Sequence, residues 1–430
     1  SGRDMSQFKL WYSHAGTPRI TVSDSYADGI YTLTLAQDTP PTPGQPDKHP
    51  LVIPIAVGLL DADGTEVEAT QVMELTQAEQ SWTFTGLSNK PVPSVLRDFS
   101  APVILDHDQD NATLALLLAH DTDPFNRYDA GRSLATDVII RMTCDNTAPD
   151  AAYLDGIAAV LRDDGLDPAF RARVLADLPT QNDIARILHD KGITPDPSAI
   201  YETFETLAIH RAQHLQDILP RIYADMQVTG AYQPEATDTG KRSLGNDVLG
   251  LISRLDGGAL AADQYGRADN MTQQLAALGC LLRAGKGDHE LAAFFDQWQH
   301  DKLVMNKWFG LQVGLATPED VAATVNRLTK HPLFDMKNPN RFRAVMGALS
   351  MNHAGFHQAD GSGYRLLAAQ LIALDALNPQ TTARMCSAFQ TWKRYDSDRQ
   401  TRMLAEVDRI LATPNLSPDT TEMLTRIRGA

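Results

Sequence analysis

The histidines His210 and His214 have the spacing in this sequence that best suits metal chemistry. They stand at i and i+4, which places two imidazoles on one face of a helix, as in the H-E-x-x-H motif of zinc enzymes. Arg211 takes the place of the glutamate general base, and a cation beside the imidazoles opposes binding of Zn²⁺. His289-Glu290 starts the same motif, but Ala293 replaces its second histidine. We therefore interpret His210 and His214 as ordinary surface histidines and predict no metal ligand.

Other chemical motifs are incomplete. Asp106–Asn111 resembles the start of a calcium loop, but Asn111 and Leu117 replace its glycine and its bidentate glutamate, so a solvated acidic turn is favoured. The sequence has no G-x-S-x-G, Walker A or Rossmann fingerprint. No histidine stands near a cysteine in a way that pairs the two for nucleophilic chemistry. We therefore predict no catalytic residue in this chain.

The stretch Asn338–Tyr364 combines a capped helix with a segment rich in polar residues. Asn338 suits the N-cap, and Pro339 suits the first helical position because its missing N–H is not needed there. Apolar residues then recur at the helical period, which predicts one buried face: Phe342, Val345, Met346 and Leu349. The following segment, Asn352–Gly363, holds two histidines and is predicted to be a loop of a length that is more often functional.

Arginines lie on the last predicted helices, at Arg341, Arg343, Arg384 and Arg394. The first two flank Phe342, so at least one of their guanidinium groups points outward. One interpretation is a set of solvated helix faces, which is the usual position of charged side chains. The other is a concave surface that receives a carboxylate or backbone carbonyls, a task that suits the bidentate guanidinium. The residues alone favour the first interpretation.

The N-terminal part of the chain has the pattern of β-structure. Alternating runs at Arg19–Ser23 and Ile30–Leu35 flank a hairpin signal whose tip is Asp28-Gly29. Leu51–Leu60 is apolar but contains Pro54, which predicts a bulge or an edge position. Further strands are predicted at Thr65–Thr70, Ser81–Thr85 and Pro102–Leu105. Short strands with no helical pattern between them predict a small β-sandwich.

From about Asn111 onward the pattern is helical. A capping side chain before a proline marks the starts of four helices: Thr317-Pro318, Asn338-Pro339, Asn378-Pro379 and Ser417-Pro418. Helices with short links and no strands between them predict a solenoid-like α-α superhelix. The predicted fold class is multidomain, all-β followed by all-α. We predict a linker or cloning remnant at 1–8, a β-sandwich domain at 9–105 and a helical superhelix domain at 106–430.

Composition restricts the classes of partner. The 430 residues include 43% hydrophobic and 21% charged residues, an ordinary globular balance. The net charge of −16 argues against nucleic acid or an anionic membrane as the main partner, because both require a basic surface. No segment resembles a transmembrane helix or a signal peptide. The scattered cysteines Cys144, Cys280 and Cys386 form no disulfide framework, which favours a reducing, cytoplasmic location.

A set of short segments in collinear order carries a family resemblance. Phe8–Pro18 reads F-K-L-W-Y-S-H-A-G-T-P. The others are Leu75–Gln80, Phe99–Val103, Asn270–Thr272, Leu303–Phe309, Asn338–Arg341, Phe356–His357, Asp360–Tyr364, Asn378–Gln380 and Lys393–Asp396. Together they resemble the bacterial aminopeptidase N branch of the M1 (gluzincin) zinc aminopeptidases. In that family a W-Y-S-x-x-G-T-P segment opens the β-sandwich that follows the catalytic domain.

The resemblance implies a four-domain enzyme, of which this chain matches only the last two domains. The family's H-E-x-x-H motif and its zinc would lie in the missing part, and neither His210/His214 nor His289 matches that motif in position. The resemblance also implies that the helical domain closes over the catalytic cleft and encloses a chamber. The residues expected to contact the far end of a bound peptide, or to shape the chamber wall, are Arg343, Gln380, Arg384 and Tyr364.

We therefore expect the C-terminal part of a cytoplasmic zinc aminopeptidase, cut from a longer polypeptide and lacking a leader at Ser1. The parent would release N-terminal amino acids from peptides through Zn-activated water, while this part alone would be inert and without cofactor. Its expected partners are peptide substrates and the N-terminal and catalytic domains of its own parent chain, with no nucleic acid and no membrane. The alternative is a stand-alone peptide-binding scaffold, for which an initiator at Met5 would argue. An independent hydrolase that uses His and Cys residues has no supporting spacing.

Overall fold

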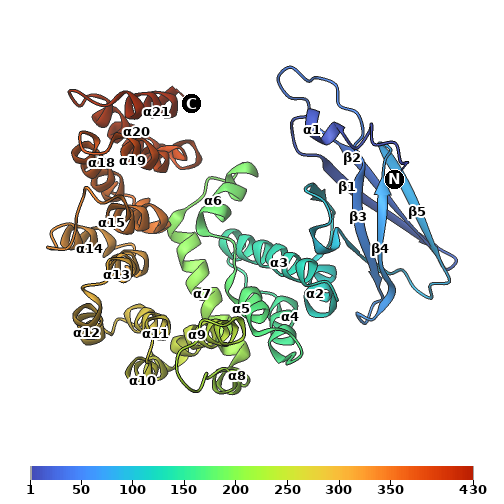
Figure 1. The fold of residues 1–430 in the computed structure, drawn as a ribbon, viewed down its shortest axis with the longest axis horizontal. Coiled ribbons are helices and arrows are strands. Elements are labelled where there is room, and N and C mark those ends of the chain that lie inside the picture. Colours follow the sequence, from blue (N-terminus) through green and yellow to red (C-terminus); the bar gives the residue numbers. More distant parts are fainter. Residues whose placement is uncertain (1, 430) are drawn as a thin grey trace. The chain divides into compact units, whose positions relative to one another are not determined.

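The computed structural model describes residues 2–429, which form two compact units (Figure 1). The first unit contains the residues up to Val138 together with Pro149–Leu178. The second contains Ile139–Ala148 together with the residues from Pro179 onward. Helix α3 (Pro124–Asp145) begins in the first unit and ends in the second. Strands come first and helices afterwards, as the sequence predicts.

The first unit begins with a β-sandwich, preceded by the short helix α1 (Leu10–Ser13). One sheet has the strand order β5-β2-β1-β7 and the other has the order β4-β3-β6. All pairs are antiparallel except β1 with β7, which is parallel. The strands are β1 (Arg19–Ala27), β2 (Ile30–Asp38), β3 (Ile53–Leu60), β4 (Glu66–Leu75), β5 (Glu79–Thr85), β6 (Val92–Val95) and β7 (Ile104–Asp106).

Strands β1 and β2 form the predicted hairpin. Their register pairs Ala27 with Ile30, which leaves Asp28 and Gly29 as a two-residue loop. Both loop residues have positive φ angles, 49° and 77°, as a type I′ turn requires. The Asp-Gly signal therefore predicts both the turn and the register of the two strands.

Pro54 lies in β3, the middle strand of its sheet. At Pro54, however, β3 has a neighbouring strand on one side only. Strand β6 pairs only with Val57–Leu60 of β3, so Pro54 has a strand partner on the β4 side alone. The register between β3 and β4 also shifts between Val57 and Leu60. Of the two predicted explanations of Pro54, the edge position is therefore confirmed, whereas the bulge lies further along β3 and not at Pro54. Strand β6 was not predicted, because its Val-Pro-Ser-Val is short and contains a proline.

Strand β3 is buried along almost its whole length because both of its faces are covered. One face belongs to the sandwich core, where alternate residues of β2 (Tyr31, Leu33 and Leu35) are fully buried. On the other face, Leu60 packs in an apolar cluster with Leu117 of α2 and Ala130 of α3. The helices of this unit besides α3 are α2 (Asn111–His120), α4 (Ala151–Arg162) and α5 (Pro168–Ala176).

The second unit is a succession of helices with short connections, as predicted for a superhelix (Figure 1). Within residues 2–429, no helix is long and apolar enough to cross a membrane. The helices up to the middle of the unit are α6 (Gln181–Asp190), α7 (Pro197–Leu215), α8 (Leu219–Asp225), α9 (Ala236–Asp256), α10 (Ala259–Arg267), α11 (Met271–Arg283), α12 (Asp288–Trp298), α13 (Lys302–Leu315) and α14 (Val321–Leu328). The later ones are α15 (Pro339–Phe342), η2 (Arg343–Gly347), α16 (Ala348–Met351), α17 (His353–Phe356), α18 (Ser362–Asp375), α19 (Pro379–Met385), η3 (Cys386–Phe389), η4 (Trp392–Arg394), α20 (Ser397–Leu411) and α21 (Pro418–Gly429).

Three of the four predicted helix starts are confirmed. The side chains of Asn338, Asn378 and Ser417 each accept a hydrogen bond from a backbone N–H in the first turn of α15, α19 and α21. At Thr317 the same signal opens a turn that leads directly into helix α14, which itself begins at Val321. The prediction was wrong there by about one turn.

The segment Asn352–Gly363, predicted to be one loop, begins with a buried helical turn and ends in the first residues of α18, which leaves only residues 357–361 as the loop. Helix α17 occupies His353–Phe356, and all four of its residues are buried. Asn352 caps it by accepting a hydrogen bond from the backbone N–H of Gly355 at 3.1 Å. Gly363 packs so closely against Phe356 that a Cβ would stand 2.4 Å from its carbonyl oxygen. The glycine is needed for close packing, and the prediction of a long loop was wrong.

Candidate functional site

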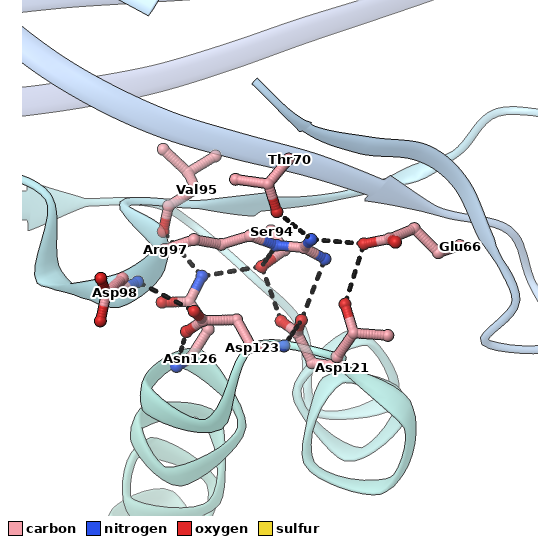
Figure 2. Close-up of polar contacts among 10 residues, drawn as sticks. Glu66, Thr70, Ser94, Val95, Arg97, Asp98, Asp121, Asp123 and Asn126 are labelled. Atoms are coloured by element: carbon pink, nitrogen blue, oxygen red, sulfur yellow. Dashed lines mark hydrogen bonds and ion pairs between the residues drawn. The ribbon is translucent and has the colours of Figure 1, made fainter. Parts of the chain in front are cut away.

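Arg97 is a buried cation in the first unit, with only 1% of its side chain exposed. It begins the short 3-10 turn η1 (Arg97–Phe99), and its guanidinium contacts strands β4 and β6 and the residue that follows α2 (Figure 2). The distances are 2.5 Å from Nη1 to Glu66 Oε1, 2.8 Å from Nη1 to Thr70 Oγ1, 2.9 Å from Nε to Ser94 Oγ and 3.0 Å from Nη2 to Asp121 Oδ1. We call these five residues the Arg97 cluster.

The backbone beside the Arg97 cluster adopts conformations that most residues avoid. Leu96, Asp98 and Phe99 have positive φ angles of 66°, 55° and 48°. The carboxylate of Asp123 holds this turn by accepting a hydrogen bond from the backbone N–H of Asp98 at 2.9 Å (Figure 2). Gly58 of β3 makes room for the cation, since a Cβ there would stand 2.2 Å from the guanidinium carbon.

The Arg97 cluster joins the sandwich to the corner between α2 and α3. The hydrogen bond from Arg97 lowers the pKa of Glu66, whereas burial raises the pKa of Asp121. The hydroxyls of Ser94 and Thr70 have no histidine, lysine or cysteine beside them in the cluster, and no metal-binding set of donors is found among the described residues, so we interpret the cluster as a structural joint. Sequence reasoning missed it, because a single arginine in a polar loop has no distinguishing spacing.

Three of the four predicted contact residues are exposed on the second unit. Arg343, in the π-helical turn η2, bonds to its own turn, with Nε 3.2 Å from Pro339 O and Nη2 2.6 Å from Asn340 Oδ1. Gln380 lies in the first turn of α19 and Arg384 in its last turn. Tyr364 is 0% exposed and so has no surface to offer a bound molecule.

Within the described part of the chain, no hydrogen bond or ion pair joins any two of these four residues. Arg341 does not lie on a solvated helix face, which was the favoured interpretation of these arginines. It is buried, its guanidinium carbon lies 4.6 Å from the ring centroid of Phe309, and its Nη2 lies 3.5 Å from Lys302 O. Of the flanking pair, Arg343 is the one that points outward.

Tyr364 belongs to a buried group of rings with His353, His357 and Tyr395. His357 Nδ1 lies 2.8 Å from Tyr364 Oη, and His353 Nε2 lies 3.0 Å from Tyr395 Oη. Burial, assisted by nearby arginine charges, lowers the pKa of His353 to about 4 and the pKa of His357 well below its ordinary value. Both imidazoles are therefore neutral at pH 7. Tyr364 is therefore a core residue that packs beneath the surface of the second unit.

A cavity of about 590 Å³ lies within the second unit. Its wall is mostly apolar and carries no Asp, Glu, Lys or Arg, and we call it the apolar cavity. Two stretches of its wall directly follow predicted contact residues, since Gly347 comes one turn after Arg343 and Met385 comes next to Arg384. The lining residues are Thr180, Gln181, Asn182, Phe204, Gly347, Ser350, Met351, His353, Phe356, His357, Met385, Ser387, Ala388 and Thr391.

The π-helical turn η2 sets the direction of one wall of the apolar cavity. A π-helical turn holds one more residue than an α-helical turn, so it rotates every later side chain of the helix, and such turns are frequent at functional sites. Gly347, Ser350 and Met351 line the cavity from this turn and from α16, which follows it. Met351 is 83% exposed, a high fraction for a long apolar side chain.

A second cavity, of about 480 Å³, adjoins the first, since Gln181, Met351 and His353 line both. We call it the charged cavity. Its glutamate, Glu205, is already held by Arg254 through two hydrogen bonds, one of 3.1 Å. The charged residues that line it are Glu205, Arg283, Asp288, Asp320 and Arg327.

Segments far apart in the sequence close the second unit around these cavities. Asn182, in the first turn of α6, accepts a hydrogen bond of 3.2 Å from Arg394 in η4, across 212 positions of the chain. Helix α7 also contacts α17. The apolar cavity therefore exists only when α6 and α7 meet the last part of the unit.

The described residues contain no group of three or more His, Cys, Asp or Glu that could hold a metal ion. On α7, His214 is exposed and His210 half-buried, and the buried Arg211 stands between them in the sequence. These residues do not fit a zinc site, so no reaction step is assigned to zinc in this chain.

Two family models match adjoining parts of the chain. A domain of unknown function described as having an Ig-like fold (DUF3458) matches residues 16–108. A domain of unknown function described as ARM repeats (DUF3458_C) matches residues 111–429. Both descriptions agree with the sandwich and the helical unit seen here.

Three proteins similar to this chain are aminopeptidases. Aminopeptidase N of Caulobacter vibrioides is 38% identical over 441 residues, which include 100% of this chain and 50% of that protein. Aminopeptidase N of Escherichia coli is 36% identical over 446 residues, 99% of this chain and 50% of that protein. A crystal structure of Legionella pneumophila aminopeptidase A in complex with aspartic acid matches with a TM-score of 0.81 and 27% identity, over 99% of this chain and 50% of that one.

The chain spans about half the length of these relatives. The resemblance noted in the sequence is thus confirmed across the whole chain, in the sandwich and in the helical unit alike. The chain belongs to the DUF3458 family, as the paired Ig-like and ARM-repeat domains that form the C-terminal part of bacterial aminopeptidase N proteins.

Proposed function

We propose that this chain works as the C-terminal part of a zinc-dependent aminopeptidase that removes N-terminal amino acids from peptides. The observation that carries the proposal is the 38% identity with an aminopeptidase N over 100% of this chain. In this proposal the zinc would belong to the half of the relatives that lies beyond the match. Bound zinc would supply the activated water for peptide hydrolysis.

In this proposal the helical unit binds the distal part of a peptide and limits access to small peptides. Arg343, Gln380 and Arg384 are exposed on or beside the segments that form the wall of the apolar cavity. A guanidinium group suits a peptide carboxylate because it stays charged and offers a planar pair of donors. The partners would be peptide substrates and the N-terminal and catalytic domains of the parent chain, in the cytoplasm, without nucleic acid or membrane.

The first test asks whether this chain alone has activity. The purified chain is incubated with leucine p-nitroanilide, with and without added Zn²⁺, and release of nitroaniline is followed. No turnover above the buffer rate is expected. Zinc-dependent turnover that persists through purification would contradict the proposal that catalysis belongs to the part of the enzyme outside this chain.

The second test supplies the missing half. The part of Caulobacter vibrioides aminopeptidase N that lies outside the match is joined to this chain, and the same part is also prepared without it. The joined protein should hydrolyse both the anilide and short peptides, whereas the part alone should lose most peptide activity. If the two behave alike on peptides, this chain has no role in peptide binding and the scaffold alternative gains support.

A further inference from the structure

We propose that the apolar cavity is a subsite for one uncharged apolar side chain of a bound peptide, such as that of leucine, methionine or phenylalanine. This inference rests on the proposed function for the identity of the ligand as a peptide. It goes beyond that function by assigning a place and a side-chain preference within the helical unit.

The apolar cavity has ample room for such a side chain. Its volume of about 590 Å³ lies within the range of about 300–1,000 Å³ that ligand pockets occupy. Phe204, Phe356, Met351 and Met385 supply its apolar surface. Methionine side chains adapt to different shapes and make favourable contacts with aromatic rings, which suits a subsite that accepts several apolar residues.

The apolar cavity should prefer uncharged side chains because its wall carries no charged residue. Charged residues are 21% of the chain, and five of them line the adjoining charged cavity, yet none lines this one. The histidines of the wall, His353 and His357, belong to the buried group of rings described above. They stay uncharged near neutral pH, because burial lowers the pKa of each. A carboxylate or an ammonium group in the cavity would lose its hydration and gain no counter-ion, so charged side chains are excluded.

The junction of the two cavities offers contacts for the peptide backbone. Gln181 lines both cavities, and within residues 2–429 no hydrogen bond to its side-chain amide is seen. An amide presents one acceptor and two donors, which match a peptide carbonyl and a peptide N–H. Met351 lines both cavities as well and is 83% exposed, so it lies free to cover an inserted side chain.

The test uses this chain alone with capped amino-acid amides as probes. N-acetyl-L-phenylalanine amide and N-acetyl-L-leucine amide represent the apolar side chain, and the aspartate and lysine analogues represent the two charges. Binding is followed by NMR of the chain labelled with ¹³C in its methionine methyl groups, of which there are 12. The resonances of Met351 and Met385 are assigned from their leucine variants.

The apolar probes should bind at least about tenfold more tightly than either charged probe, because the charged groups have no partner in the cavity. The methyl resonances of Met351 and Met385 should shift together, and distant methionines should not. The inference is overturned if the four probes bind alike, or if the shifts arise away from these two methionines.

Surface variants probe the site without disturbing the core. Ser387→Trp should fill the cavity from an exposed position, and Met351→Asp should place a carboxylate over it. Each is expected to weaken binding of the phenylalanine probe about tenfold, and Gln181→Ala about threefold through loss of a neutral hydrogen bond. Leu303→Asp is the matched control, because Leu303 is 71% exposed on α13 and does not line either cavity.

Wild-type binding by Ser387→Trp and Met351→Asp would also overturn the inference, as would an equal loss in Leu303→Asp. The result is independent of the proposed enzyme activity, since the capped probes have no free amino group to cleave and no catalytic half is present. A failed activity test would thus leave the subsite standing, and a failed binding test would leave the proposed hydrolase function standing.

Discussion

At the scale of single residues, Arg97 is the side chain whose removal should cost most. Arg97→Ala leaves Asp121 buried with no counter-ion and no donor from Arg97, and breaking a buried pair in this way costs about 3–5 kcal/mol. Urea unfolding measures the loss. The control is Arg3→Ala, which breaks the exposed pair with Glu74 and should lower the free energy of unfolding far less, because solvent screens exposed ion pairs. If both variants lost the same free energy of unfolding, burial of the Arg97 cluster would add nothing to the stability of the chain.

His353 makes the stability of the chain depend on pH. Its pKa in the folded chain is about 4, below the ordinary value of 6.5, so on acidification the unfolded chain takes up this proton first. The stabilisation is fully present above pH 6.5 and is lost as the pH falls to about 4, by roughly 3 kcal/mol from this residue.

His353→Gln removes the titrating group and keeps a polar side chain near Tyr395 Oη. The difference in unfolding free energy between wild type and this variant should shrink as the pH falls through that window. Urea unfolding at several pH values measures it. A difference that does not change with pH would mean that the folded and unfolded chains bind the His353 proton equally.

Arg343 and Arg384 are tested in the joined enzyme described above. Arg384→Ala and Arg343→Ala should each raise KM for a tripeptide about tenfold, because a charge-assisted hydrogen bond to its carboxylate is lost. KM for leucine p-nitroanilide should stay unchanged, since that substrate has no distal carboxylate. The control is Arg365→Ala, an exposed arginine of α18 that pairs with Asp360. If KM rose equally for both substrates, these arginines would contribute to the folded structure and not to binding of the peptide carboxylate.

At the scale of helices and strands, Asn352 serves two helices at once. Its Nδ2 donates to Val313 O and Ala316 O at the end of α13, at 3.0 and 2.9 Å, and its Oδ1 caps α17. Asn352→Ala should therefore cost about 2–3 kcal/mol of unfolding free energy. Asn378→Ala, which removes a single cap from α19, should cost about 1 kcal/mol. If urea unfolding gives the same loss for both, the bonds to α13 contribute nothing.

Local signals explain which elements the sequence could predict. The Asp28-Gly29 turn and the caps at Asn338 and Asn378 depend on neighbouring residues, so they are readable from the sequence. The π-helical turn η2 and the helix α17 depend on packing against other helices, and no local pattern reports them. The same is true of Arg341, whose burial against Phe309 comes from a distant helix.

At the scale of the whole molecule, the net charge of −16 sets the expected partners. Neither a 20-base-pair DNA duplex nor vesicles with about 30% phosphatidylserine should bind at about 0.15 M salt, because both surfaces repel an acidic protein. Fluorescence anisotropy and co-sedimentation measure these two interactions. Binding that weakens steeply with added salt would reveal a basic patch that the overall charge conceals.

The apolar cavity shows the limit of sequence reasoning about a site. Two of the residues that the sequence singled out, Arg343 and Arg384, precede wall segments of this cavity in the chain, and their role in binding stays a prediction. It could not point to Gln181 or Phe204, which reach the cavity from helices placed far earlier in the chain. Such residues have no shared spacing, and only the folded chain brings them together.

The hydrogen bond between Asn182 and Arg394 has a consequence for the order in which the chain is made. The two residues are 212 positions apart, so a ribosome that adds about 5–20 residues per second needs roughly 10–40 s between them. During that interval helices α6 and α7 have left the ribosome while their later neighbours do not yet exist. The apolar residues around Phe204 therefore stay in contact with solvent or with a chaperone until the last helices of the second unit are synthesised.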